Sequence, residues 1–271
     1  MLTLTNTKNI KNNFVITKKF RLKNITKNQV IELKRNLEKF GVVVFENQKL
    51  NYKDLLKISN FLGKAISHNY LDKISKYPQI SKIIKKKNDK KMFGGEWHTD
   101  SSYLKKPPKF TILYSIKVPG DNLGGTHFAS LYNPYSLLSL KIKKKLGKLY
   151  VCHSSDTQLS KFRKKKQKNK IKKEFTSLQK LIKNNKSNNK SIYFSPGHFK
   201  NFYDEKKRKI NSKKEIYFIK ILKNKILAKK NIFTYNWKKN SLVIWNNTKV
   251  LHKPQNNFKN KERVMLRLNI I

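Results

Sequence analysis

The C-terminal segment, RVMLRLNII, constrains the fold more than any other part of this chain. In an extended strand Arg263 and Arg267 share one face, because residues an even number of positions apart point the same way. The opposite face is wholly apolar, with Val264, Leu266 and Leu268. Two buried guanidiniums cost much free energy unless they meet anions, and arginine binds carboxylates through two parallel hydrogen bonds. The strand therefore predicts a carboxylate-bearing ligand. The alternative, two structural arginines that bridge acidic side chains, is weakened by the small number of acidic residues, 15.

Two further fragments offer ligands for a metal. His98 and Asp100 are two residues apart, so an extended segment presents both to the same side, and His252 follows a strand-like run near the C-terminus. Two histidines and one carboxylate can hold Fe(II) on one face and leave the other face open. The His-x-Asp spacing alone is weak evidence, because a histidine with a nearby aspartate is more often a hydrogen-bonded pair.

Short apolar runs alternate with Gly, Pro and Asn, and this pattern predicts an α+β fold that is mainly β. Strands are expected at 41–45, 110–118, 241–245, 250–252 and 264–271, and helices at 26–39, 51–63, 134–147 and 214–229. The lysine-rich stretch 75–92 is expected to be a surface connection. A single domain spans 1–271, with a basic insertion or lid at about 161–190, where the sequence is least core-like.

The formal net charge of +49 would ordinarily favour a nucleic-acid partner. Only six of the 64 basic residues are Arg, however, and nucleic-acid sites use Arg for bidentate and stacking contacts. Lys is abundant together with Asn and Ile, whose codons are A/T-rich, so genome bias is a sufficient cause. We expect no nucleic-acid partner.

Several absences in the sequence narrow the class of protein. The single cysteine, Cys152, allows no internal disulfide. No apolar stretch is long enough for a secretory signal or a membrane span, so a cytoplasmic protein without membrane contact is expected. The nucleotide-binding glycine motifs are missing. Oligomeric state stays open, including a homo-oligomer.

The chain resembles the Fe(II)/2-oxoglutarate-dependent dioxygenases of the taurine dioxygenase (TauD/TfdA) type. The resemblance extends from about residue 41 to the end, and the order and spacing of its motifs both agree. The segments that carry it are Trp97-His98-Thr99-Asp100-Ser101-Ser102-Tyr103, Pro107-Pro108, Leu113-Tyr114, Gly124-Gly125-Thr126-His127-Phe128-Ala129-Ser130, Trp245-Asn246-Asn247, His252 and Arg263-Val264-Met265-Leu266-Arg267.

The resemblance implies a double-stranded β-helix (jelly roll, cupin-like) core with flanking helices. It implies iron ligands His98, Asp100 and His252, with O2 and 2-oxoglutarate as co-substrates. Thr126 and Arg263 would hold the distal carboxylate of 2-oxoglutarate, and Arg267 would support the co-substrate or bind an anionic group of a small-molecule substrate. His68 lies near a substrate-binding histidine of the taurine enzymes, although its local match is loose and a plain loop histidine is the alternative.

The chain departs from the family pattern at three places. Asn246 replaces an aspartate and removes a charge expected near the iron site. Residues 93–96, FGGE, lack the side-chain amide that the taurine enzymes use, so taurine is disfavoured. Thr126 keeps its place although the glycines before it are shifted. The remaining histidines are expected outside the site. His127 is expected to point away from the metal, and neither His153 nor His198 has another possible ligand at a sequence spacing typical of a metal site.

The resulting hypothesis is an enzyme that hydroxylates, or otherwise oxidises, an unactivated C–H bond of a small, anionic substrate and releases succinate and CO2. Asp100 argues against a halogenase, because those relatives lack the carboxylate. Three alternatives stay open: a tailoring oxygenase with a larger natural-product substrate, a non-oxidative cupin-like metal enzyme, and a basic nucleic-acid-binding jelly roll.

Overall fold

The computed structural model describes residues 9–11, 14–17, 20–90, 92–157, 159, 174–184 and 190–271. Most of the regular structure is β, with a few helices. The larger sheet has nine strands in the order β1-β2-β3-β15-β7-β17-β6-β5, and β4 pairs with β17. These strands are β1 Asn9–Lys11, β2 Phe14–Thr17, β3 Val42–Phe45, β4 Ala65–Ile66, β5 Asp72–Ile74, β6 Tyr77–Lys85, β7 Phe110–Lys117, β15 Leu242–Asn246 and β17 Arg263–Ile270.

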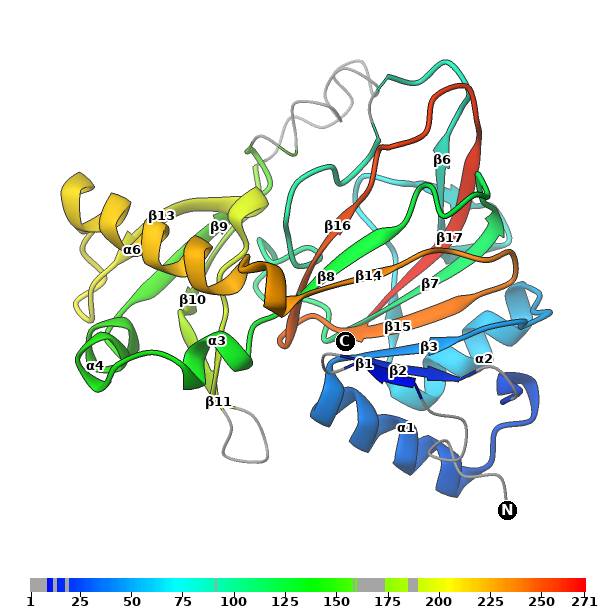
Figure 1. The fold of residues 1–271 in the computed structure, drawn as a ribbon, viewed down its shortest axis with the longest axis horizontal. Helices are drawn as coiled ribbons and strands as arrows, with labels where there is room; N and C mark the ends of the chain where they lie inside the picture. Colours follow the sequence, from blue (N-terminus) through cyan, green and yellow to red (C-terminus); the bar gives the residue numbers. More distant parts are fainter. Residues whose placement is uncertain are drawn as a thin grey trace.

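A second sheet, β14-β8-β16, packs against one face of the larger sheet. Its strands are β8 Thr126–Ser130, β14 Ile232–Tyr235 and β16 Val250–Pro254. An apolar layer joins the two sheets: Phe128 of β8 and Val250 of β16 belong to the same cluster as Val44, Trp245 and Met265 of the larger sheet. The expected strands at 110–118, 241–245, 250–252 and 264–271 are thus confirmed, and they form one sandwich (Figure 1).

Two helices cover the other face of the larger sheet. They are α1, Lys27–Phe40, and α2, Tyr52–Leu62, and both lie beneath the sheet in Figure 1. Thr26 and Gln29 form a capping box at the start of α1, and Gly41 ends it with a φ of 82°, where a side chain would be strained. The strand that follows is buried on both faces, because the sandwich packs on one side and the helices on the other.

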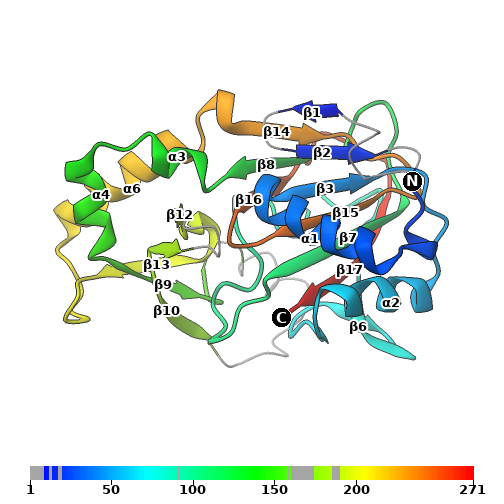
Figure 2. The ribbon, with the colours of Figure 1, turned by 90° about the horizontal axis from the view of Figure 1, so that it is seen from below.

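The remaining described elements form a second lobe, on the left of Figure 1 and again in Figure 2. Its strands pair as β10-β9-β13 and β11-β12 around one apolar cluster. The elements are α3 Asn133–Ser136, α4 Leu140–Gly147, β9 Tyr150–Ser154, β10 Thr176–Lys180, β11 Ile182–Asn184, β12 Lys190–Ile192, η2 Pro196–His198, β13 Phe199–Tyr203, α6 Ser212–Ile226 and η3 Lys229–Asn231; η1, Leu22–Asn24, precedes α1.

Three sequence expectations need correction. The stretch 75–92 is not merely a surface connection, because β6 pairs with β17 and buries Ile80 completely. The helix expected at 134–147 is two helices, since the chain leaves the helix at Leu137 and a new one begins with Ser139 as N-cap. In the expected insertion 161–190, residues 176–184 contain two strands and the fully buried Leu181. Residues 161–173 and 185–189 of that insertion lie outside the described residues.

No helix within the described residues combines the length and the apolar character needed to cross a bilayer.

Candidate active site

His98 and His252 are brought together by a short antiparallel bridge between two distant parts of the chain. The backbone N–H of each donates to the carbonyl of the other, at 3.0 and 2.9 Å. His252 lies on β16, whereas His98 lies in the loop that leads from β6 to β7. The bridge sets the two imidazole centroids 4.2 Å apart. Gly94 packs on the His98 ring with a φ of 76°, and a Cβ there would lie 3.0 Å from His98 Cε1, so the approach favours glycine.

Three ligand atoms converge between these rings. Asp100 Oδ1 lies 3.6 Å from Nε2 of His98 and 3.5 Å from Nε2 of His252, and ligand atoms of the three residues all fall within 4.8 Å of one another. A divalent ion bound at about 2.1 Å by ligands at right angles would space them by about 3 Å. The distances are too long for hydrogen bonds but close to that spacing, so the residues fit a metal.

The protonation states agree with this fit. His98 Nδ1 lies 2.6 Å from the Glu96 carbonyl, which can only accept, so Nδ1 carries the hydrogen and Nε2 has its lone pair free. Burial lowers the pKa of His98, despite the opposing charge of Asp100, and lowers the pKa of His252 to about 3. Burial alone would raise the pKa of Asp100, but Arg267 and the two histidines hold it well below its ordinary value. At neutral pH the site offers two neutral imidazoles and one carboxylate.

A buried hydrogen-bond chain orients Asp100. Thr111, on β7, donates from Oγ1 to Asp100 Oδ2 at 2.7 Å, and Asn247 Nδ2 donates to Thr111 Oγ1 at 2.9 Å. Asn247 Oδ1 accepts in turn from the Asp100 backbone N–H, at 3.2 Å, and from Trp245 Nε1, at 3.0 Å. Oδ2 is therefore held by a hydroxyl, while Oδ1 faces the histidines and forms an ion pair with Arg267.

The sequence interpretation assigned the wrong asparagine to this neighbourhood. Asn246 does not face the site: its Oδ1 accepts from the Thr248 backbone N–H and hydroxyl, and its Nδ2 lies 3.4 Å from Glu38. The substitution at 246 thus leaves the surroundings of Asp100 intact. Strand alternation is the reason, because neighbouring residues at the end of β15 point to opposite sides.

Arg263 meets Thr126 and Trp237 beside a cavity that His252 also lines. Arg263 Nη2 lies 3.4 Å from Thr126 Oγ1, which also accepts from Trp237 Nε1 at 2.9 Å. The guanidinium lies 5.7 Å from the centre of the Trp237 ring. Arg263 is buried, and its Nε has no hydrogen-bond partner among the described residues; burial alone lowers its pKa to about 10, so it stays charged at neutral pH. A cavity opens beside it, lined by residues of both sheets.

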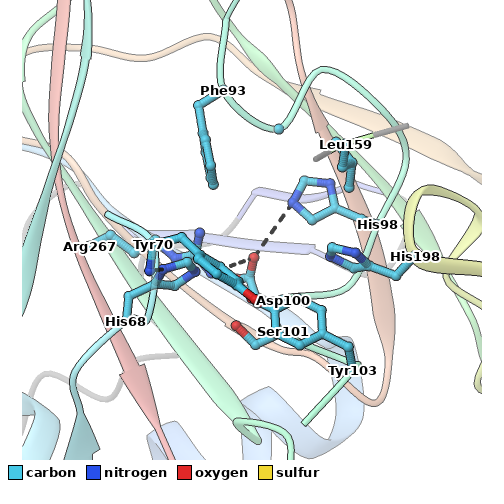
Figure 3. A pocket seen from close by; sticks show the side chains of 11 residues that line it. His68, Tyr70, Phe93, His98, Asp100, Ser101, Tyr103, Leu159, His198 and Arg267 are labelled. Atoms are coloured by element: carbon cyan, nitrogen blue, oxygen red, sulfur yellow. Dashed lines mark hydrogen bonds and ion pairs between the residues drawn. The ribbon is translucent and has the colours of Figure 1, made fainter. Parts of the chain in front are cut away.

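Arg267 lies between this cavity and a second one. Its Nη2 is 2.7 Å from Asp100 Oδ1, and its Nε donates to Asn269 at 3.2 Å. The second cavity shares Phe93, Gly94, His98 and Arg267 with the first. The six other side chains that line it are shown in Figure 3 with Asp100: His68, Tyr70, Ser101, Tyr103, Leu159 and His198.

The other histidines divide between the site and the core. His68 is buried at the second cavity, and its Nδ1 accepts from the Tyr70 backbone N–H. His127 points away, as expected, and pairs with Thr234. His153 accepts from the Ser195 backbone N–H in the core. His198 was wrongly expected to be remote: its ring lies 5.7 Å from that of His98. No sequence signal marks it, because its neighbours come from other elements.

A buried pair of neutral imidazoles and one carboxylate, beside a cationic cavity in a mostly β fold, is the arrangement of the non-haem Fe(II) oxygenase class. The chain belongs to the taurine catabolism dioxygenase TauD, TfdA family, whose sequence profile matches residues 6–269. Members of this family are oxidoreductases that depend on Fe(II) and on alpha-ketoglutarate, which is 2-oxoglutarate.

Curated relatives agree with the family over part of their length. An alpha-ketoglutarate-dependent sulfonate dioxygenase of Saccharomyces cerevisiae is 30% identical over 131 residues, which are 44% of this chain and 31% of the yeast protein. An alkylsulfatase of Acinetobacter baylyi is 25% identical over 186 residues, or 64% of this chain and 56% of that protein. The chain spans 34% of a further relative from Schizosaccharomyces pombe. It thus matches about a third of each yeast relative.

Solved structures show the same fold at low identity. A taurine dioxygenase from Burkholderia xenovorans superposes with a TM-score of 0.78 at 17% identity, and the match covers 95% of this chain and 85% of that one. AAD-2, solved with Mn(II) and N-oxalylglycine, gives a TM-score of 0.77 at 19% identity, with coverage of 97% and 95%.

Proposed function

We propose that this protein is an Fe(II)- and 2-oxoglutarate-dependent oxygenase that hydroxylates an unactivated C–H bond of a small, anionic organic molecule. The observation that carries the proposal is the convergence of Nε2 of His98, Nε2 of His252 and Oδ1 of Asp100 inside a buried site. When bound there, Fe(II) would supply the oxidative chemistry that converts 2-oxoglutarate and O2 to succinate, CO2 and a hydroxylated substrate. The two facing sheets would be the double-stranded β-helix core of a single domain.

In this proposal Arg263 and Thr126 hold the distal carboxylate of 2-oxoglutarate. Arg263 is a buried cation without a described acidic partner, so a carboxylate would neutralise it. Thr126 Oγ1 already accepts from Trp237 and faces Arg263, and its own hydroxyl hydrogen has no described acceptor, so it is free to donate to the same carboxylate.

The second cavity would hold the substrate. This cavity is small, so it favours a small molecule over a large natural product. Arg267 offers positive charge there, and His68 lies on the same wall, so an anionic group such as a carboxylate or sulfonate would dock at this end. The sulfonate named for the yeast relative is chemically consistent with this end of the cavity.

Anaerobic addition of Fe(II) and 2-oxoglutarate tests the proposal. The wild-type protein should develop the visible charge-transfer absorption of a bound 2-oxo acid, and Asp100→Ala should abolish it. His127→Ala is a matched control, because it removes a neighbouring imidazole that points away from the site. Unchanged absorption in Asp100→Ala would remove Asp100 from the metal site, and no absorption in the wild type would contradict the proposed function.

A further inference from the structure

His198 is a buried histidine in the wall of the second cavity, and neither the family motifs nor the sequence pattern assigns it a role. Only 7% of its surface is exposed. Within the part of the chain that the structure describes, Nδ1 has no hydrogen-bond partner of acceptable geometry, although the Ser154 main chain lies close to the ring. A buried polar side chain in this condition is unusual, because nearly all such groups are hydrogen-bonded.

The segment that carries His198 is fixed against the metal-ligand loop. The Gly197 backbone N–H donates to the Trp97 carbonyl at 2.8 Å, and the Thr99 N–H donates to Ser195 Oγ at 3.0 Å. A Cβ at Gly197 would lie 2.6 Å from Leu159 Cδ1 and 3.1 Å from the Trp97 oxygen, so the two segments are in close contact. His198 cannot move away from the cavity unless this packing is broken.

Two aromatic neighbours fix the orientation of the His198 ring. It stands nearly perpendicular to the rings of His98 and Tyr103, with centroid distances of 5.7 and 5.0 Å. Figure 3 shows His198 on one side of the cavity and Arg267 with His68 on the other, with Asp100 between them. The cavity therefore has a cationic end and a separate end where an imidazole lacks a partner.

The geometry points to His198 as a specificity-determining residue that hydrogen-bonds a second polar group of the substrate, a hydroxyl or an amine, at the end remote from the anion. This inference rests on the proposed function. A neutral imidazole has one donor and one acceptor nitrogen, which suits either group. A substrate that ends in a methyl group would leave the imidazole unpaired, and sites that lose a buried hydrogen bond in this way discriminate strongly.

Binding of matched sulfonates to the protein loaded with Mn(II) and 2-oxoglutarate tests the inference without turnover. The pairs are ethanesulfonate with 2-hydroxyethanesulfonate or 2-aminoethanesulfonate, and propane-1-sulfonate with its 3-hydroxy and 3-amino derivatives. Isothermal titration should show the wild type binding at least one polar member about tenfold more tightly than the unsubstituted member. Equal affinities within every pair, or no binding of any polar member, would overturn the inference.

Two variants and one control assign the effect to His198. His198→Phe keeps an aromatic ring against Tyr103 but has no nitrogen, so the affinity ratio within the pair should fall to about one. His198→Asn retains a side-chain amide and should keep part of the preference, and it provides a second measurement if the first variant is unstable. His127→Phe should keep the wild-type ratio. A wild-type ratio in His198→Phe would overturn the inference, whereas failure of Mn(II) and 2-oxoglutarate to bind at all would contradict the proposed function itself.

Discussion

Arg263 and Arg267 extend from the same strand on the same face, and both are buried, yet their surroundings differ in kind. Arg267 meets Asp100 at 2.7 Å and Asn269 at 3.2 Å, so it has an acidic partner inside the protein. Arg263 meets a threonine hydroxyl, a methionine sulfur and the face of a tryptophan, none of which carries a charge. The difference shows which of the two cations already has an acidic partner and which has none among the described residues.

The largest expected effect is on stability when Arg267 is replaced. In the metal-free protein, Arg267→Met should lower the free energy of unfolding by about 3–5 kcal/mol, because Asp100 would remain buried without its countercharge. Arg263→Met should leave that free energy unchanged or raise it, since it removes a buried charge that has no described partner. Denaturant unfolding of both variants measures the difference. Equal losses would show that the two arginines are structurally equivalent.

Affinity for 2-oxoglutarate should show the reverse order. Arg263→Met should weaken binding of 2-oxoglutarate to the Mn(II)-loaded protein by about 100-fold, because the distal carboxylate would lose its bidentate partner. Arg263→Lys keeps the charge but not the paired geometry and should fall between wild type and Arg263→Met. Isothermal titration measures both, and unchanged affinity in Arg263→Met would place the carboxylate elsewhere.

Orientation of Asp100 should matter less than its charge. Thr111→Val removes the hydroxyl that holds Oδ2 while nearly keeping its shape, and we expect affinity for Mn(II) to fall by about 10- to 100-fold. Thr111→Ser should restore most of the loss. Ser115→Ala, on the same strand, removes a buried hydroxyl that donates to Lys238 and should leave metal affinity unchanged. If Thr111→Val also bound the metal normally, Arg267 alone would suffice to position the carboxylate.

The smallest effect concerns the pH dependence of stability. Burial lowers the pKa of both Arg263 and His153, but only His153 is neutral at pH 7. Burial lowers the pKa of Arg263 to about 10, still far above neutral, but lowers the pKa of His153 from 6.5 to about 3. Below about pH 6.5, His153 therefore binds a proton in the unfolded chain but not in the folded protein. The contribution of neutral, buried His153 to the free energy of unfolding is complete above that pH and is lost as the pH falls toward 3. Between pH 7.5 and 5.5 the wild type should lose about 1 kcal/mol more unfolding free energy than His153→Gln. An identical pH dependence in both proteins would show that His153 is protonated in the fold.

Local patterns were enough to predict several elements. The capping residues and apolar spacing before Gly41 predicted α1, and the alternation of RVMLRLNII predicted β17, because each depends on neighbours in the chain. The strand β6 was missed because Lys82 and Lys85 interrupt its apolar pattern, and Ile80 is buried in a cluster that includes Leu266 and Leu268 from far along the chain. The strands at 176–184 were missed because Leu181, too, is buried by residues from distant segments of the chain.

The ligand types and their order follow from the amino-acid sequence: an imidazole, a carboxylate, a second imidazole and two arginines on one strand face. Their partners follow from the folded arrangement of distant segments. In the folded protein Asp100 pairs with Arg267 and Thr111, whereas Arg263 has no acidic partner among the described residues. Asn246 points away from the site, and the His198 ring lies beside the His98 ring. Alternation along a strand is set by adjacent residues, so it can be seen in the sequence. The partner of a buried charge depends instead on which distant segments the sheets and bridges bring together.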